Sequence, residues 1–220
     1  MGRTETVIIR PADSQTNKLA AEIVANGGLI AFRTDTFYGL GVDPLNETAV
    51  ARIKAAKGRE EGKPILLLIS DTDQTVRLTV NRPKVFDSLS QIFWPGPLTI
   101  VMKAAAHLPE EVTAGTGTIG LRLPDDENVR DLVRVCGGLL TATSANRSGE
   151  APARSAHDVQ AYFSTGMDLI IDGGEVTATK PSTVIDITHD SVKLIREGAV
   201  TRAKLETALG FQIVDFKFKI

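Results

Sequence analysis

Residues 64–69, PILLLI, are the feature that most restricts how this chain can fold. Six apolar residues bounded by polar ones are typical of a short strand that is covered on both faces. Shorter apolar runs occur at 29–32, 98–102, 119–123, 139–143 and 169–171, and segments with helical periodicity lie between several of them. The chain therefore needs a sheet against which helices pack.

The remaining pattern predicts a mixed α/β fold. We expect further strands at 7–9 and 212–219, and a hairpin formed by 183–187 and 192–195. Helices are expected at 14–26, 47–56, 83–93, 128–136, 156–163 and 202–209, with Asn46 as the N-cap of the second. Because some strands follow one another directly, the pattern favours a mixed sheet over a doubly wound parallel one.

Composition limits the classes of function. The 220 residues contain no repeat or long linker, so we expect one domain, 1–220. The net charge of −2 provides no overall field that would attract nucleic acid. A single cysteine, Cys136, excludes a disulfide framework, and no residues show metal-ligand spacing, so we expect no protein-held metal. No apolar run reaches ~18 residues, and the polar N-terminus is unlike a signal peptide, so we expect a cytoplasmic protein that does not enter membranes.

A glycine-rich segment, RTDTFYGLG at 33–41, follows the expected strand at 29–32. Thr34 and Thr36 place two hydroxyl groups around Asp35, and the glycines allow a ligand to approach the backbone closely. The segment can serve as a binding loop for a small polar substrate. It can equally be a tight turn whose hydroxyl groups bond to their own backbone.

A group of cations follows the second expected helix. Lys57 and Arg59, with Lys63 shortly after, can hold a phosphate or carboxylate. The alternative is that they only complement the helix dipole at its C-terminal end. Glu60 and Glu61 come next and could neutralise them.

Three further segments carry polar groups at strand ends. In TATSANRSG, 141–149, Ser144 and Asn146 alternate and are expected to face one side of an extended stretch; the alternative is a polar loop of turn-forming residues. Arg122 interrupts an apolar strand, so its head group must leave the core or meet an anion. Ser182 precedes the expected hairpin and Arg196 ends it. Walker and serine-hydrolase motifs are absent from the sequence.

Taken in order, these segments resemble the YrdC-like family of threonylcarbamoyl-AMP synthases, from about Thr16 to Gly198, followed by a short tail, 199–220. The resemblance is carried by RTDTFYGLG, KGR, WPGPLTIV, IGLRLP, SANRSG, IIDGG, PSTVID and IREG. It implies a twisted mixed sheet of about seven strands, flanked by helices and enclosing a cationic cleft, in the short form that lacks an extra C-terminal domain. Arg33, Glu60 and Thr143 stand where the family usually has proline.

The resemblance also implies a reaction. Threonine and bicarbonate would combine as N-carboxy-threonine, which attacks the α-phosphorus of ATP and releases pyrophosphate. Threonylcarbamoyl-AMP would then pass to a complex that modifies tRNA, and Mg²⁺ would accompany ATP. The implied catalytic residues are Lys57 and Arg59. Contacts to ATP and bicarbonate are implied for Lys57, Arg59, Lys63, Thr118, Ser144, Asn146, Pro152 and Arg196. Contacts to threonine are implied for Thr34, Thr36, Arg122, Ala142 and Ser182.

Two other readings of the same fold remain. One is an RNA-binding module, with at most weak direct contact to RNA. The absence of a basic run and the aromatic content of 5 % disfavour it. The other is a paralogue without synthase activity. The Lys-x-Arg and Ser-x-Asn pairs that the family uses are both intact, which argues against that loss.

Overall fold

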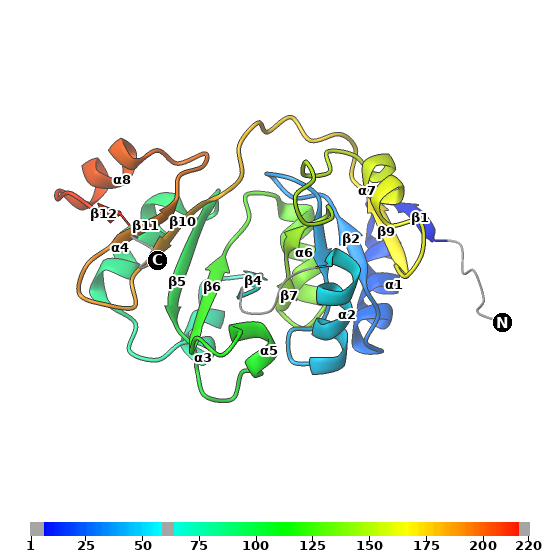
Figure 1. The fold of residues 1–220 in the computed structure, drawn as a ribbon, viewed down its shortest axis with the longest axis horizontal. Coiled ribbons are helices and arrows are strands. Elements are labelled where there is room, and N and C mark those ends of the chain that lie inside the picture. Colours follow the sequence, from blue (N-terminus) through cyan, green and yellow to red (C-terminus); the bar gives the residue numbers. More distant parts are fainter. Residues whose placement is uncertain (1–6, 59–63, 216–220) are drawn as a thin grey trace.

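In the computed structural model, which describes residues 7–58 and 64–215, the strands form two mixed sheets with helices packed against them (Figure 1). The five-stranded sheet has the order β1-β9-β2-β3-β8 and consists of β1 (Ile8–Pro11), β2 (Ile30–Phe32), β3 (Gly39–Gly41), β8 (Thr143–Ser144) and β9 (Leu169–Asp172). The seven-stranded sheet has the order β12-β11-β10-β5-β6-β4-β7 and consists of β4 (Leu66–Ile69), β5 (Leu98–Lys103), β6 (Thr118–Arg122), β7 (Leu139–Thr141), β10 (Thr183–Asp186), β11 (Lys193–Arg196) and β12 (Val214–Asp215).

The mixed α/β class and the mixed sheet of about seven strands are confirmed, and the second sheet, of five strands, was not expected. The strand expected at 139–143 is divided at Ala142, whose N–H donates to Leu66 O at 2.8 Å. The part before Ala142 pairs with β4 in one sheet, and the part after it pairs with β3 in the other. One apolar run thus contributes a strand to each sheet, which a sequence pattern does not distinguish from a single longer strand.

The end of the glycine-rich segment is also a strand, β3, where the sequence indicated a loop. Gly41 makes this possible, because a Cβ atom there would lie 2.7 Å from the ring of Phe32 and 2.9 Å from Leu140 Cγ. The absence of a side chain allows β3 to pack closely between neighbouring segments.

The helices of the described residues are α1 (Ser14–Ala25), α2 (Glu47–Lys57), α3 (Gln74–Leu78), α4 (Lys84–Phe93), α5 (Glu110–Thr113), α6 (Glu127–Val135), α7 (Ala156–Tyr162) and α8 (Arg202–Leu209). All six expected helices are present, and the short α3 and α5 were not expected. Asn46 is confirmed as an N-cap, since its side chain accepts from Ala49 N at 3.0 Å. Among the described residues, no helix has the length and apolar character needed to cross a membrane.

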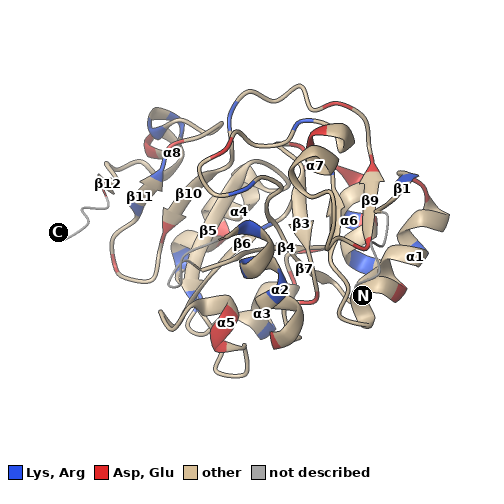
Figure 2. Cartoon of the chain, turned by 45° about the vertical axis from the view of Figure 1, so that its right-hand side comes forward, with Lys and Arg blue, Asp and Glu red and all other residues tan. Residues whose placement is uncertain are grey.

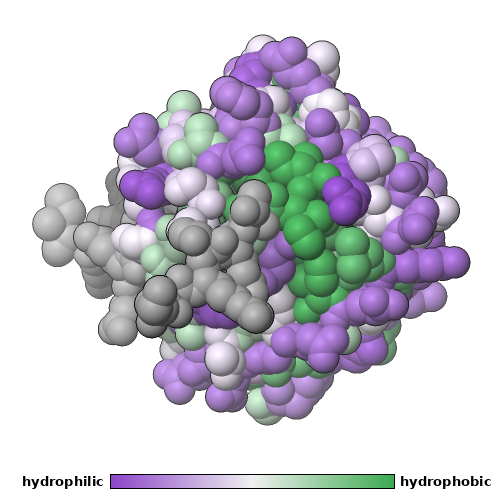
Figure 3. Space-filling view, turned by 90° about the vertical axis from the view of Figure 1, so that its right-hand side faces the viewer, coloured by the Kyte–Doolittle hydropathy of each residue, from purple (hydrophilic) through white to green (hydrophobic). Residues whose placement is uncertain are grey.

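Two apolar clusters form the core. The larger one draws residues from both sheets, and the other includes side chains of α1 and α6, which lie side by side. Leu67 belongs to the first cluster and Leu68 to the second. Strand β4 is therefore covered on both faces, as the run at 64–69 predicted. Figure 3 shows that further apolar side chains gather in the middle of the face where β1 and α1 lie, and Ile8 of β1 is 40 % exposed.

The predicted hairpin is confirmed as the antiparallel pair β10 and β11. The connection 173–182 leads to it from β9 in the other sheet and arches over the top of Figure 1. The last expected strand is present as β12, and the expected positions 216–219 lie outside the described residues.

Candidate active site

Four neighbouring strands end or begin at the same edge of the seven-stranded sheet. Thr183 of β10 pairs with Leu98 at the start of β5, and Val184 pairs with Arg196 at the end of β11. Strand β6, antiparallel to β5, ends there at Arg122. The loop 33–38, between β2 and β3 of the other sheet, reaches this edge through a contact with Arg122. The register therefore gathers groups that are far apart in the sequence.

Arg122 is the centre of the first group of polar residues. It is 2 % exposed, and its Nε donates to Gly96 O at 3.0 Å, while Nη1 donates to Thr36 Oγ1 at 2.9 Å. Its Nη2 lies 2.5 Å from Asp35 Oδ2 in an ion pair. Burial lowers the pKa of Arg122, and the charge of Asp35 opposes that shift. The sequence predicts that the Arg122 head group leaves the core or meets an anion, and in the structure that anion is Asp35.

Arg196 and Ser182 complete this group. Arg196 Nη2 donates to Ser182 O at 2.9 Å and to Ser182 Oγ at 3.3 Å, and Thr99 Oγ1 donates to Ser182 Oγ at 3.0 Å. The pKa of Arg196 is lowered by burial and also by the positive charge of Arg122. The two guanidinium groups therefore lie close to one another. Because Ser182 Oγ accepts the hydrogen bonds from Arg196 and Thr99, its own proton can still be donated to a ligand.

The two threonines of the loop 33–38 differ in role. The Thr34 hydroxyl donates to Phe37 O at 2.7 Å and accepts from the N–H groups of Thr36 and Phe37. The alternative of a self-bonded turn therefore holds for Thr34. Thr36 Oγ1, by contrast, contacts Arg122 and Thr34 Oγ1 and belongs to the Arg122 group. The loop is anchored by the fully buried Tyr38, whose hydroxyl donates to Gly174 O at 2.8 Å and accepts from Gly173 N at 3.2 Å, and burial raises its pKa to about 12.

Lys57 forms a second group with the segment Ser144–Asn146. Its side chain is 6 % exposed, and Nζ donates to Asn146 O at 2.7 Å, to Asn146 Oδ1 at 3.4 Å and to Ser144 O. The alternative of a solvated helix-end charge is therefore wrong for Lys57. The ammonium group is directed to another segment of the chain, where it joins the Lys-x-Arg and Ser-x-Asn motifs.

The expectation that Ser144 and Asn146 face one side is wrong. Asn146 N donates to Ser144 O at 2.9 Å, so the chain turns between them, and Asn146 is buried whereas Ser144 is exposed. The Asn146 amide donates to Glu150 O at 2.7 Å and to Arg147 O at 3.0 Å. This side chain shapes the loop that follows it.

Strand pairing joins the two groups. Gly39 of β3 pairs with Ser144 of β8, and Ala145 N donates to Tyr38 O at 2.8 Å. The loop that carries Thr36 therefore leads directly into the strand beside Ser144. Ala142 lies at the same place, since a Cβ atom on Gly39 would be 3.7 Å from Ala142 Cβ.

The other predicted contacts are placed less centrally. Pro152 is exposed and precedes Ala153, whose carbonyl accepts from Tyr38 N at 3.1 Å. Thr118 begins β6 and Arg122 ends it, so the structure separates these two by the length of the strand, about 13 Å. Arg59 and Lys63 lie outside the described residues.

Sequence reasoning missed two side chains of the Arg122 group, Asp35 and Thr99. In the sequence pattern Asp35 is only the residue between two threonines. The sequence did contain a signal for Asp35, because an arginine buried in a strand, such as Arg122, requires a carboxylate partner. Thr99 gave none, since a threonine inside a strand is ordinary.

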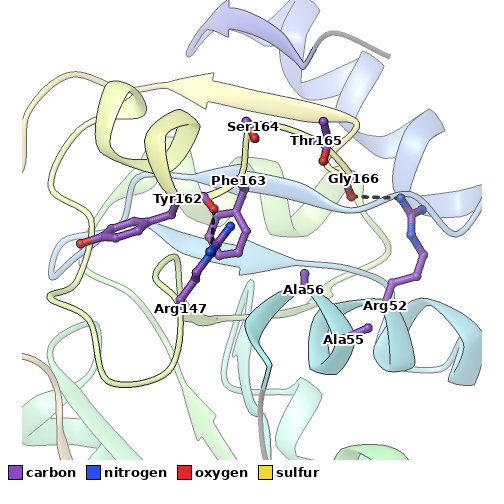
Figure 4. Close-up of a pocket in the computed structure, with 9 residues that line it drawn as sticks. All are labelled: Arg52, Ala55, Ala56, Arg147, Tyr162, Phe163, Ser164, Thr165 and Gly166. Atoms are coloured by element: carbon purple, nitrogen blue, oxygen red, sulfur yellow. Dashed lines mark hydrogen bonds between the residues drawn. The ribbon is translucent and has the colours of Figure 1, made fainter. Parts of the chain in front are cut away.

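A cavity of about 320 Å³ lies between α2 and the connection from α7 to β9 (Figure 4). Arg52 and Arg147 line it, but Arg52 pairs with Asp168 Oδ2 at 2.9 Å and Arg147 Nε donates to Tyr162 O at 3.2 Å. None of the predicted site residues lines this cavity or a second one of about 450 Å³ beside Lys103. The predicted cationic cleft therefore stays a prediction.

Comparison with known proteins shows one family over most of the chain. The model of the Sua5, YciO and YrdC family, described as "Telomere recombination", matches residues 22–198. Proteins named threonylcarbamoyl-AMP synthase are similar to the chain. The protein from Pyrococcus abyssi is 37 % identical over 193 residues, which cover 88 % of this chain and 57 % of the relative. The protein from Halorhodospira halophila is 35 % identical over 167 residues, covering 76 % and 87 %. The protein from Bacillus subtilis is 34 % identical over 197 residues, covering 89 % and 57 %.

Solved structures agree in fold. Sua5 of P. abyssi in complex with L-threonine has a TM-score of 0.89 at 34 % identity, with 96 % of this chain and 62 % of that one covered. YciO of E. coli has a TM-score of 0.77 at 27 % identity, with 88 % and 95 % covered. The chain thus spans a little over half the length of the P. abyssi and B. subtilis relatives.

Proposed function

This chain belongs to the Sua5, YciO and YrdC family, and we propose that it is an L-threonylcarbamoyladenylate synthase. It would form threonylcarbamoyl-AMP and pyrophosphate from L-threonine, bicarbonate and ATP. The observation that carries the proposal is the Arg122 group, in which two cations and three hydroxyl groups converge, next to the pairing of Lys57 with the Ser144–Asn146 segment.

The Arg122 group has the chemistry of an amino-acid site. The positive charge of Arg122 complements a carboxylate. Thr36 and Ser182 offer hydroxyl groups for the side-chain hydroxyl of threonine. The P. abyssi relative was solved with L-threonine, which supports this choice of amino acid.

The Lys57 group would take ATP and bicarbonate. Lys57 and Arg196 supply positive charge, and Ser144 presents an exposed side chain beside Lys57. We further propose that ATP enters as its magnesium complex. Among the described residues, no set of three His, Cys, Asp or Glu side chains could hold a metal ion, and Mg²⁺ readily binds through substrate phosphates.

The rate enhancement would come from placing reactants that repel one another. Bicarbonate, the threonine carboxylate and the triphosphate are all anionic, so fixed cations in a partly buried site reduce their repulsion and orient them. After the threonine ammonium group has released a proton to solvent, its nitrogen bonds to the bicarbonate carbon with loss of water, and the resulting carbamate oxygen displaces pyrophosphate from the α-phosphorus.

The product would be handed to a complex that transfers the threonylcarbamoyl group to tRNA. Neither alternative function is favoured. Figure 2 shows Lys and Arg interspersed with Asp and Glu over the chain, which does not favour an RNA-binding face. The intact Lys57, Ser144 and Asn146 arrangement does not favour an inactive paralogue.

The proposal is tested by identifying the product. The purified protein is incubated with Mg²⁺, ATP, L-threonine and ¹³C-bicarbonate, and nucleotides are analysed by mass spectrometry. We expect an adenylate that contains both threonine and the ¹³C atom. An adenylate of threonine without the ¹³C atom, or no adenylate, would contradict the proposal.

A further inference from the structure

Asp35 carries hydrogen-bonding capacity that the protein does not use. Its side chain is 13 % exposed, and Oδ2 forms the ion pair with Arg122. The other oxygen, Oδ1, is buried, and no donor among the described residues reaches it. Buried carboxylate oxygens without a donor are uncommon and costly, so this atom indicates a missing cationic or N–H partner.

The guanidinium of Arg122 does not use the second oxygen of Asp35. The contact of Nη2 with Asp35 lacks hydrogen-bond geometry, and Nη2 has no hydrogen-bond partner among the described residues. A carboxylate that served only to neutralise Arg122 would be expected to use both oxygens on the guanidinium. Nη2 is occupied by its 2.5 Å contact with Oδ2, so the open capacity on this pair is the acceptor Oδ1.

A zwitterion fits this pair. The α-ammonium group of an amino acid needs the acceptor Oδ1, and its α-carboxylate needs the positive charge of the two arginines beside it. Among the charged groups that touch Arg122 in the described residues, Asp35 is the acid, while Arg196 adds a second positive charge nearby. An ammonium group placed elsewhere in this cluster would face cations without compensation.

We propose that Asp35 Oδ1 binds the α-ammonium group of the amino-acid substrate and thereby selects an α-amino acid over an acid that lacks nitrogen. This inference rests on the proposed function and deepens it. It assigns to Asp35 the nitrogen that must react with bicarbonate, next to Thr36 and Arg122, which would hold the other groups of the same substrate.

Two other roles for Asp35 make different predictions. If Asp35 only orients Arg122, its loss weakens every ligand that uses Arg122. If Asp35 instead binds Mg²⁺, its loss matters only when Mg²⁺ and ATP are present. Magnesium retains several water molecules, which the buried position of Oδ1 does not favour.

The test measures binding by calorimetry without Mg²⁺ or ATP. The ligands are L-threonine and the 2,3-dihydroxybutanoate of the same configuration, in which a hydroxyl replaces the ammonium group. In Asp35→Asn, Arg122 retains the oxygen of the amide, so the NH₂ group faces the ligand nitrogen. We expect the Kd of L-threonine to rise ~10–100-fold and that of dihydroxybutanoate to change less than ~3-fold.

Asp126→Asn is the matched control, because Asp126 pairs with Arg33 of the same loop at 3.5 Å and Asn also serves as an N-cap. It should bind both ligands like the parent. Equal weakening of both ligands in Asp35→Asn, or unchanged threonine binding, would overturn the inference. A parent protein that fails to bind threonine would overturn the proposed function as well.

If Asp35→Asn does not fold, the inference is tested by ligand binding to the parent protein alone. The parent should bind L-threonine ~10–100-fold more tightly than dihydroxybutanoate, since only threonine supplies a charged donor to Oδ1. Equal binding of the two ligands would overturn the inference without any variant.

Discussion

Lys57 illustrates how a residue that belongs to a local pattern acquires its role from a distant segment. The sequence placed it at the end of a helix beside other cations, where a charge favours the dipole. Its partners, the carbonyl groups of Ser144 and Asn146, lie 87 and 89 positions further along the chain. Spacing alone could not predict that contact. The requirement that Arg122 meet an anion could be predicted, but not that Asp35 would be the anion, because only the tertiary fold brings them together.

Lys57→Ala should affect both stability and rate. It leaves the buried Asn146 O and the partly buried Ser144 O without their charged donor, which costs about 1–3 kcal/mol of unfolding free energy. If Lys57 also acts on the reacting anions, adenylate formation should fall ~10²–10³-fold. Lys54→Ala, in the same last helical turn, is the control and should keep the parent rate. A Lys57→Ala protein that melts like the parent and keeps more than about a third of its rate would show that Lys57 has neither role.

Thr36 and Ser182 predict selectivity for a hydroxylated side chain. Valine matches threonine in shape but leaves buried hydroxyl groups unpaired, so kcat/KM should be lower for valine by roughly 10⁴-fold. The measurement is pyrophosphate release with each amino acid at limiting concentration. Comparable values for the two amino acids would show that Thr36 and Ser182 do not bind the substrate hydroxyl.

At the scale of elements, the sequence predicts the ends of helices correctly where a local signal, such as a capping residue, is present. Helix α8 occupies the predicted range, and the N-cap of α2 was read correctly. Helices α3 and α5 were missed because they are short and lack side-chain caps. Strand β3 was missed because glycine has low strand propensity, and its place depends on close packing against Phe32.

Tyr38 ties the loop 33–38 to the end of β9, and Tyr38→Phe should loosen this link. The substitution removes the hydroxyl partner of Gly173 N and Gly174 O, two partly buried hydrogen bonds, at a cost of about 0.5–1.5 kcal/mol. For a chain of this size, that lowers Tm by about 1–6 °C. Tyr162→Phe is the control, because Tyr162 is half-buried and should shift Tm little. Equal melting of Tyr38→Phe and the parent would show that the hydroxyl is not a structural anchor.

At the scale of the whole molecule, the candidate site lies where one sheet meets the other. The edge formed by β5, β6, β10 and β11 contributes Arg122, Ser182 and Arg196, and the five-stranded sheet contributes the loop with Asp35 and Thr36. A sequence pattern predicts strands but not their order, so neither the division into two sheets nor this meeting point could be read from it. The ordered set of motifs predicted which residues matter, and the fold shows how they are grouped.

The most direct test of the account is the dependence of pyrophosphate release on each substrate. The purified protein is assayed in bicarbonate-depleted buffer to which ATP, Mg²⁺, L-threonine and bicarbonate are added. The assay is then repeated with each of these four components left out in turn. We predict that every omission reduces pyrophosphate release to the background of the reaction without protein. Equal release without threonine, or without bicarbonate, would contradict the central claim that the clustered cations bring these reactants together on ATP.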